Sequence, residues 1–392
     1  MLVSLAVAWT MVQGGRFLLS PLLPEIIESL SLTPATAGLA LGAFQMVYAI
    51  TQYPSGRLSD VSGRAVVVIP GLVVLVGAFL VLTATTTVLS FLLAMGLLGV
   101  GKGLFASPSR ALVSDLFVEN RGRALGIYTA GTDLGGLVAA GLSLAVVGGG
   151  LGLLGTGAVG TRAVELGWRF PFALVAVALV GVTILFGLWS REPLGLERPT
   201  GGLLATGRRL LGTAEQRETL IAYGLFYFVV GAWINFLPTY LADGRGLPAP
   251  LPQLLFAVVF TVGVAVKPAA GAISDRVPRR LVAVLGLLCA VLSLVVVTFA
   301  QTLAGLTVAI AIFAVGYKTQ FPIVDALVMD AAPNANTGGD VGAARALFLG
   351  VGALGPVYMG AVATVASYEL AMAGLVASLL VAAGVLAWGL RR

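Results

Sequence analysis

Charged side chains inside long apolar stretches are the residues of this 392-residue chain that could do chemistry. Arg16, Lys102, Asp133 and Lys318 lie deep within such stretches, and the chain's third lysine, Lys267, also occurs in one, whereas the polar segments use arginine. Ionisable groups are costly in an apolar medium, and those found there usually face a cavity or pair with one another. Three deep cations and one deep acid therefore favour a bound anion, held by charge-assisted hydrogen bonds to carboxylate, phosphate or sulfonate oxygens.

Polar side chains at helical spacing accompany these charges. Trp9, Gln13, Arg16 and Ser20 form one stripe, and a similar stripe begins at Gln45. We predict an anion site formed by Arg16, Lys102 and Lys318. Its further lining is predicted to come from polar and aromatic side chains: Gln13, Gln45, Tyr48, Tyr128, Tyr227, Asn235, Tyr317 and Gln320.

Two acids stand near these cations, and we assign them to proton coupling. Asp133 is deep, and Asp325 follows Lys318 by seven residues, on the same face of a helix and about 10 Å along its axis. A carboxylate near a substrate-binding cation can exchange its proton against substrate charge. The alternative is a closed network, Lys102 with Asp133 and Lys318 with Asp325, that contacts no substrate.

The composition identifies an integral membrane protein. Hydrophobic residues make up 58% of the chain and charged residues 10%, whereas soluble domains carry about 25% charged residues. The absence of histidine and the single Cys289 make metal or histidine chemistry improbable, so we expect no cofactor. A nucleophile and base pair and a phosphate-binding loop are also missing, and we expect no enzyme.

The elements that must position these side chains are membrane helices of about 20 residues each. We predict an all-α protein with twelve spans, at 3–24, 36–55, 66–86, 88–109, 123–148, 169–189, 219–241, 251–270, 281–300, 303–328, 341–364 and 369–390. The first span lacks a small-residue cleavage site and is read as a retained helix.

Arginine predicts the orientation of these helices, because short cytoplasmic loops are enriched in basic residues. The loops after even-numbered spans contain most of the arginines, whereas those after odd-numbered spans contain little more than Arg162 and Arg245. We expect a plasma-membrane protein with both termini in the cytoplasm. The positive net charge of +6 is then mostly an orientation signal and does not indicate nucleic acid.

A repeat divides the chain into two halves. The stretch from Gly56 to Arg64 returns 215 residues later as Gly271 to Arg279. We predict two six-helix bundles at 1–190 and 219–392, joined by a polar cytoplasmic linker at 191–218. Six is an even number, so the bundles are parallel repeats related by a pseudo-two-fold axis along the membrane normal, an arrangement that places substrate near mid-membrane at the repeat interface.

The pattern Gly-x-Leu-x-Asp-x-x-Gly-Arg at Gly56 to Arg64 resembles the signature loop of the major facilitator superfamily. The second copy keeps Gly271, Asp275 and Arg279 but places Pro278 where a glycine is expected. Trp168 to Phe172 and Gly352 to Pro356 are also similar to that family. The resemblance covers the whole chain and implies transport of a small solute by alternating access, but it says little about the substrate.

The signature stretch has its own physical interpretation as a gating latch. Gly56 and Gly63 permit close helix contact or unusual backbone angles. The charges can join helix ends, and we predict Arg110 as the partner of Asp60, with Arg64, Asp115 and Arg123 in the same cluster. The second half is predicted to contribute four further gating residues: Asp275, Arg279, Asp340 and Arg345. A polar turn that only marks topology is the alternative.

Together these patterns predict a secondary active transporter, expected to be a monomer, that moves a small organic or inorganic anion. A co-transported proton or other ion and the lipid bilayer are the remaining expected partners. Two alternatives stay open. One is proton-coupled efflux of a hydrophobic or cationic compound, with Asp133 central; the other is a receptor or scaffold that transports nothing. The sign of the charge on the preferred ligand distinguishes the two transport hypotheses.

Overall fold

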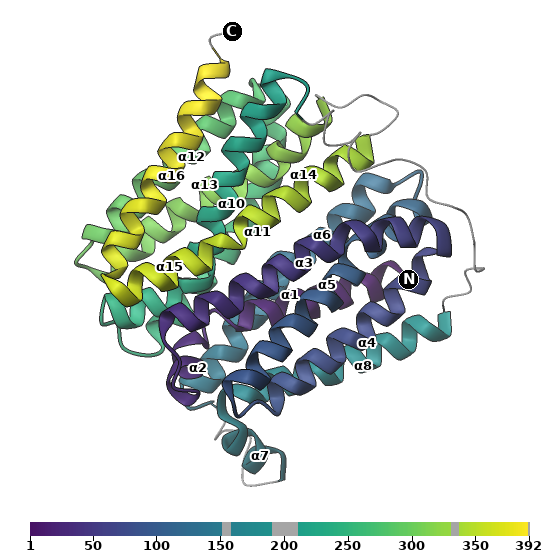
Figure 1. Ribbon diagram of the computed structural model, residues 1–392, viewed down its shortest axis with the longest axis vertical. Helices are drawn as coiled ribbons and strands as arrows, with labels where there is room; N and C mark the ends of the chain where they lie inside the picture. Colours follow the sequence, from purple (N-terminus) through teal and green to yellow (C-terminus); the bar gives the residue numbers. More distant parts are fainter. Residues whose placement is uncertain (151–157, 190–210, 331–336, 391–392) are drawn as a thin grey trace. The chain divides into compact units, whose positions relative to one another are not determined.

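The computed structural model describes residues 1–150, 158–189, 211–330 and 337–390, and this part of the protein consists of helices joined by short turns (Figure 1). Within the helices, the side chains of residues 121, 158–159, 329–330 and 337–341 lie outside that part. Contacts between residues define two compact units, 1–199 with 237–257 and 200–236 with 258–392. The predicted linker lies mostly outside the described residues, and the bundle boundaries stay a prediction.

Most helices of the first half are long enough to cross a membrane. They are α1 (Leu2–Leu18), α2 (Leu23–Ser29), α3 (Pro34–Ser62), α4 (Arg64–Thr83), α5 (Val88–Leu116), α6 (Arg121–Val147), the short α7 (Ala158–Leu166), the 3-10 turn Gly167–Arg169 and α8 (Phe170–Trp189). Those of the second half are α10 (Ala214–Thr239), a π-helical turn at Tyr240–Gly244, α11 (Leu251–Ser274), α12 (Arg279–Phe299), α13 (Leu303–Asp330), α14 (Thr337–Gly352), α15 (Leu354–Val365) and α16 (Tyr368–Gly389).

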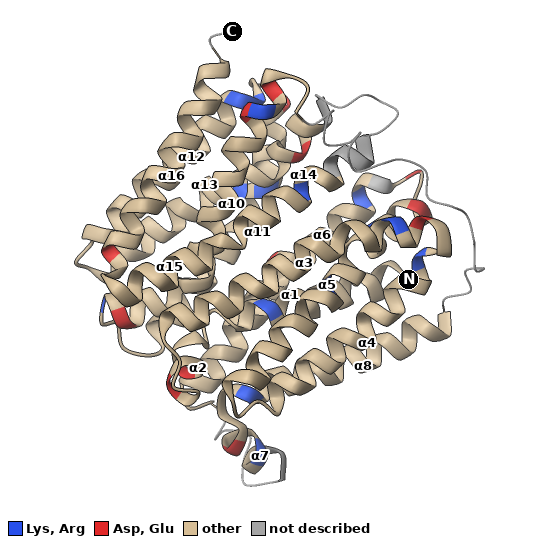
Figure 2. Cartoon of the chain, in the orientation of Figure 1, with Lys and Arg blue, Asp and Glu red and all other residues tan. Residues whose placement is uncertain are grey.

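Each of the twelve predicted spans coincides with one of these helices or helix pairs, which confirms the all-α membrane fold. In the described residues ten helices are long and apolar enough to span a membrane, and the pair α1 and α2 makes an eleventh. The remaining helix, α3, has 29 residues but a more polar composition. Figure 2 shows the charged residues concentrated toward helix ends, with long uncharged stretches between them.

Two predicted helices are broken. The first span bends by 55° between α1 and α2. Pro21 and Pro24 remove backbone donors there, and Pro24 lies in the first turn of the new helix. The eleventh span is interrupted between α14 and α15, just before Pro356.

The signature stretch is mostly helix, which corrects its prediction as a loop. Residues from Gly56 to Ser62 form the last turns of α3, and Gly63 alone breaks the helix, with φ 97° and ψ 146°. Glycine adopts that backbone conformation without a side-chain clash. At 29 residues, α3 is about 43 Å long, so it extends well beyond a hydrocarbon core of about 30 Å.

Helix caps and one close glycine contact fix the helices that carry the site. The Thr33 side chain accepts from the Thr36 backbone N–H at the start of α3, and a reciprocal cap between Thr87 and Ser90 starts α5. On α6, a Cβ at Gly135 would lie 2.7 Å from the Gly14 nitrogen of α1. Because Gly135 has no side chain, the α1 and α6 backbones are in direct contact at this point.

Candidate functional site

Lys102 is the centre of a buried aromatic cluster in the first unit. It lies on α5 and is 5% exposed. Its Nζ is 4.7 Å from the ring centroid of Tyr48, 5.6 Å from that of Phe44 and 6.0 Å from that of Trp9. Rings at such distances attract a cation through their quadrupole. Helices α1, α3 and α5 thus each contribute to the surroundings of one ammonium group.

Trp9 is held in place by α6. Its indole N–H donates to the Thr132 hydroxyl at 2.9 Å, and its ring stacks on Tyr128 with centroids 5.3 Å apart. The hydroxyl groups of Tyr128 and Ser109 are 2.7 Å apart and share a hydrogen bond, which connects α6 back to α5. The predicted lining residue Tyr128 therefore packs on the Trp9 ring and holds it in place.

Arg16 and Gln13 follow Trp9 on the same face of α1, because side chains three and four positions apart are neighbours on a helix. The Arg16 guanidinium lies 4.5 Å from the Phe17 ring centroid and acts electrostatically on both Lys102 and Tyr48. Gln13 is 6% exposed, and among the described residues its Oε1 atom has no hydrogen-bond partner.

The face of α3 that meets Lys102 is polar as well as aromatic. Gln52 Nε2 donates to the Tyr48 hydroxyl at 2.5 Å, and Gln45 is buried one turn earlier. The structure thus collects in the first unit all the predicted ligand residues of the first half. They are Gln13, Arg16, Gln45, Tyr48, Lys102 and Tyr128.

The pairing of Lys102 with Asp133 does not form. Asp133 is buried on α6 with 4% exposure. Lys102, however, makes no ion pair with any residue in the described part of the chain, and its interactions are with the three rings and Arg16. A closed Lys102 and Asp133 network is therefore wrong for this structure.

Lys318 has a similar aromatic setting in the second unit. It lies on α13 and is 1% exposed, with Nζ 4.5 Å from the Phe260 centroid and 4.7 Å from that of Tyr317. Tyr317 stacks on Phe313 at 5.8 Å. The predicted residue Tyr227 stacks on Phe348 of α14, with centroids 5.5 Å apart.

Two predicted lining residues of the second unit are committed to packing. The Gln320 side chain accepts from the Tyr223 hydroxyl at 3.1 Å and donates to the Ala283 carbonyl at 3.0 Å, so its amide ties α13 to α10 and α12. Asn235 Nδ2 donates to the Gly231 carbonyl of its own helix at 2.6 Å. We therefore remove Gln320 from the ligand candidates, since both ends of its amide are used.

Asp325 pairs with Arg345, a partner that the sequence did not indicate. Arg345 Nε donates to Asp325 Oδ1 at 3.0 Å, and Nη2 contacts the other carboxylate oxygen. This two-point pair joins α13 to α14. It favours a structural role over the predicted proton coupling by Asp325 and gating by Arg345, because a carboxylate held by a guanidinium suits a structural link better than proton exchange. The side chain of Asp340, the predicted gating companion of Arg345, lies outside the described residues.

In the signature stretch, Arg64 bridges two carboxylates. Its Nε donates to Asp115 Oδ2 at 3.0 Å, and its Nη1 contacts Asp60 and also donates to Ser59 Oγ at 3.0 Å. The prediction that Arg110 pairs with Asp60 is wrong. Because only Gly63 separates α3 from α4, Arg64 follows Asp60 by four residues and pairs with it in place of Arg110.

Gly56 lies where α3 passes α5, since a Cβ there would come within 3.2 Å of the Ser107 hydroxyl. Arg110 acts electrostatically on Tyr48 and Tyr128, and its Nε finds no hydrogen-bond partner in the described chain. Arg110 thus acts on two tyrosines of the aromatic cluster, and its role in gating stays a prediction.

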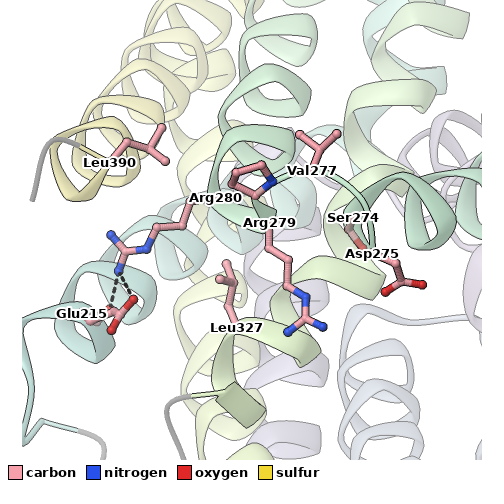
Figure 3. A pocket seen from close by; sticks show the side chains of 9 residues that line it. Glu215, Ser274, Asp275, Val277, Arg279, Arg280, Leu327 and Leu390 are labelled. Atoms are coloured by element: carbon pink, nitrogen blue, oxygen red, sulfur yellow. Dashed lines mark hydrogen bonds and ion pairs between the residues drawn. The ribbon is translucent and has the colours of Figure 1, made fainter.

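The second copy of the signature lines an open hollow of about 470 Å³ in the second unit (Figure 3). Arg280 makes ion pairs with Glu215 at 3.2 Å and with Glu218 at 2.9 Å. Asp275 forms no ion pair with any residue that the structure describes. Arg279 extends past Leu327 in Figure 3. The two-carboxylate bridge of the first copy therefore has no counterpart at Asp275.

Phe44 and Phe260 are neighbours of the two buried lysines that the sequence did not indicate. The Phe44 ring lies beside Lys102 and the Phe260 ring beside Lys318, and in each case the lysine comes from another helix. A phenylalanine in an apolar helix has no distinguishing spacing, and only the position of Phe44 beside the polar stripe from Gln45 is suggestive.

Comparison with known proteins places the chain in a family. A sequence profile described as Major Facilitator Superfamily matches residues 5–356 and, in a second match, residues 219–392. A solved bacterial homolog of the human lysosomal transporter Spinster, inward-facing and unoccupied, has a TM-score of 0.84 at 18% identity over 98% of this chain and 95% of its own.

Curated relatives match over part of the chain. The probable sulfoacetate transporter SauU of Cupriavidus necator is 27% identical over 66% of this chain and 60% of its own length. The hexuronate transporter of Bacillus subtilis is 23% identical over 68% and 61%, respectively. Multidrug resistance protein D of Escherichia coli is 24% identical over 52% and 48%. The chain thus spans about three fifths of the length of the first two relatives.

The profile match extends over most of the residues, and the helices superpose on a solved transporter. The chain belongs to the major facilitator superfamily and has the multi-pass helical fold of a membrane protein of that family.

Proposed function

We propose that this transporter moves a small organic anion by alternating access, with Arg16 and Lys102 as its principal anion-binding groups. The observation that carries the proposal is the environment of Lys102. Its ammonium is buried among three rings from two helices, and no carboxylate of the described residues neutralises it. An aromatic face attracts the cation but leaves its full charge available to an anion.

The neighbouring guanidinium strengthens this argument. Arg16 and Lys102 carry like charges that act on each other, and an anion bound by both would reduce that repulsion. An anion bound by both groups gains from both charges in surroundings that screen little. Two similar proteins are named for sulfoacetate and hexuronate, which are both organic anions.

The other parts of the proposal assign roles around this site. Lys318 provides the corresponding buried cation of the second unit, and Asp133 is the group that couples transport to protons. The latch formed by Arg64, Asp60 and Asp115 controls the conformational change. We further propose cytoplasmic termini, following the arginine distribution, together with a plasma-membrane location and a monomer.

Equilibrium binding to the purified protein tests the proposal. The panel contains carboxylates, sulfonates, phosphate, nitrate and hydrophobic cations. The proposal expects binding of at least one organic anion, competition among anions, and loss of that binding in Lys102→Gln. Binding of hydrophobic cations only, unchanged in Lys102→Gln, would refute it.

A second function is favoured by a different observation. The first unit combines the buried acid Asp133 with the aromatic cluster, and one similar protein is named for multidrug resistance. Proton-coupled efflux of a hydrophobic cation would use these groups, with Asp133 as the substrate counter-charge. In that case Asp133→Asn abolishes cation binding and Lys102→Gln does not.

A further inference from the structure

We propose that the transported anion carries a hydroxyl group and that Gln13 recognises it. This inference rests on the proposed anion-binding function and narrows its substrate class to hydroxylated organic acids. The transporter would then discriminate between two anions of the same charge and similar size by one hydrogen bond.

The inference starts from the unsatisfied amide of Gln13. The side chain is 6% exposed, and its Oε1 has no hydrogen-bond partner in the part of the chain that is described. Buried polar atoms in native proteins nearly always have partners, and an unmade bond there is unfavourable. A buried acceptor that the protein leaves unmatched is suited to a donor that arrives with the ligand.

The position of Gln13 places that acceptor beside the cations. Trp9, one turn before it on α1, covers Lys102, and Arg16, one turn after it, acts electrostatically on Lys102. An acid group attracted by the two cations therefore brings its neighbouring substituent toward the amide. The close packing of α1 on α6, where a Cβ at Gly135 would lie 2.9 Å from the Gln13 Cβ, fixes the start of the side chain.

The chemistry separates ligand classes. A simple carboxylate or sulfonate has only acceptor atoms, so it can occupy the cations and accept from the Gln13 NH₂ group, but it leaves Oε1 unmatched. A hydroxy acid offers acceptors to the cations and one O–H donor to Oε1. A site built around a substrate hydroxyl discriminates strongly against the analogue that lacks it, because its own polar atom is then left without a bond.

Two pairs of anions test this on the purified full-length protein. They are lactate with propionate and 2-hydroxyethanesulfonate with ethanesulfonate, each measured by equilibrium binding. We expect the hydroxylated member to bind about tenfold or more tightly in at least one pair. In Gln13→Met, which keeps the length but removes the amide, we expect that ratio to fall to about threefold or less.

Control variants separate the possible failures. Gln301→Met, which changes an exposed glutamine in the turn after α12, is expected to keep the wild-type ratio. Gln13→Leu, which also lacks the amide, serves as a second test if the Met variant does not fold. Equal binding within both pairs, or a preference that persists in the folded Gln13 variants, overturns the role of Gln13. If Lys102→Gln still lowers the affinity for both anions of a pair, the proposed anion-binding function stands. If neither member of either pair binds the wild type, the hydroxy-acid proposal fails, and the wider anion panel decides the proposed function separately.

Discussion

The ammonium nitrogen of Lys102 lies 4.7 Å from the centre of the Tyr48 ring, and the Tyr48 hydroxyl accepts a hydrogen bond from Gln52. The ring is therefore fixed by its own helix while it faces a charge on α5. Ring faces attract a cation without neutralising it, whereas a carboxylate makes it part of a neutral pair. This difference is the physical basis for the proposed anion site.

Replacement of Tyr48 separates the ring from its hydroxyl. In Tyr48→Phe the ring remains, and we expect anion affinity to stay within about twofold of wild type. In Tyr48→Leu the ring is lost, and we expect anion binding to weaken by about 0.5 to 2 kcal/mol because Lys102 loses the nearest of its three rings. Calorimetric titration with the tightest anion of the panel measures both. Equal loss in the two variants would assign the effect to the hydroxyl.

Gly135 should not tolerate a side chain. In Gly135→Ala the new methyl group would lie 2.7 Å from the Thr10 oxygen and the Gly14 nitrogen, both backbone atoms of α1. We expect a loss of about 1 to 3 kcal/mol in stability, seen as a lower unfolding temperature in detergent. Gly141→Ala, on the same helix with nothing within 4 Å, is the matched control and should lose no stability. A stable Gly135→Ala protein would contradict the close contact of α1 and α6.

Arg64 should affect the rate of transport more than binding. Arg64→Gln removes the bridge between Asp60 and Asp115, and we expect turnover in proteoliposomes to change by about three- to tenfold, equivalent to about 1 kcal/mol. Anion affinity should stay unchanged, since the latch holds no ligand. Arg162→Gln breaks an exposed pair with Glu165 and is the control, with no expected effect. A change in affinity without a change in turnover would contradict the latch.

Asp133 should determine the response to a proton gradient. In Asp133→Asn the side chain keeps its shape but carries no exchangeable carboxyl proton. We expect pH-gradient-driven uptake to fall to the level seen without a gradient, while counterflow of the same anion continues. Asp325→Asn, which breaks the pair with Arg345, should lower stability instead. Gradient-driven uptake that is unchanged in Asp133→Asn would remove Asp133 from the coupling step.

Much of the fold could be predicted from the sequence, because a span of about 20 apolar residues is a strong signal of a membrane helix. The repeat gives a second indication of the helix order. The ends were less predictable. The break at Pro21 and Pro24 lies inside an apolar run, and α3 continues through polar residues as far as Ser62. Hydropathy identifies the part of a helix in hydrocarbon, whereas caps and glycines determine where the helix stops.

The charges of the site and part of its lining were predictable, but its packing contacts were not. Lys102 and Lys318 stand out because lysine is rare in this chain and costly in an apolar interior. The ring of Phe44 reaches Lys102 from another helix, and such contacts depend on packing that no local spacing reveals. Gln320 shows the opposite error, since a polar residue near mid-helix can serve helix packing as readily as a ligand.

The most direct test of the proposed function is uptake of a labelled organic anion into proteoliposomes by wild type and Lys102→Gln. Lys267→Gln, which changes another lysine in a predicted helix, is the matched control. Loss of the buried cation should weaken anion binding by about 2 kcal/mol or more, so uptake at low concentration should fall more than tenfold in Lys102→Gln. Lys267→Gln should keep wild-type uptake. Undiminished anion uptake by a folded Lys102→Gln protein would contradict the proposed role of Lys102.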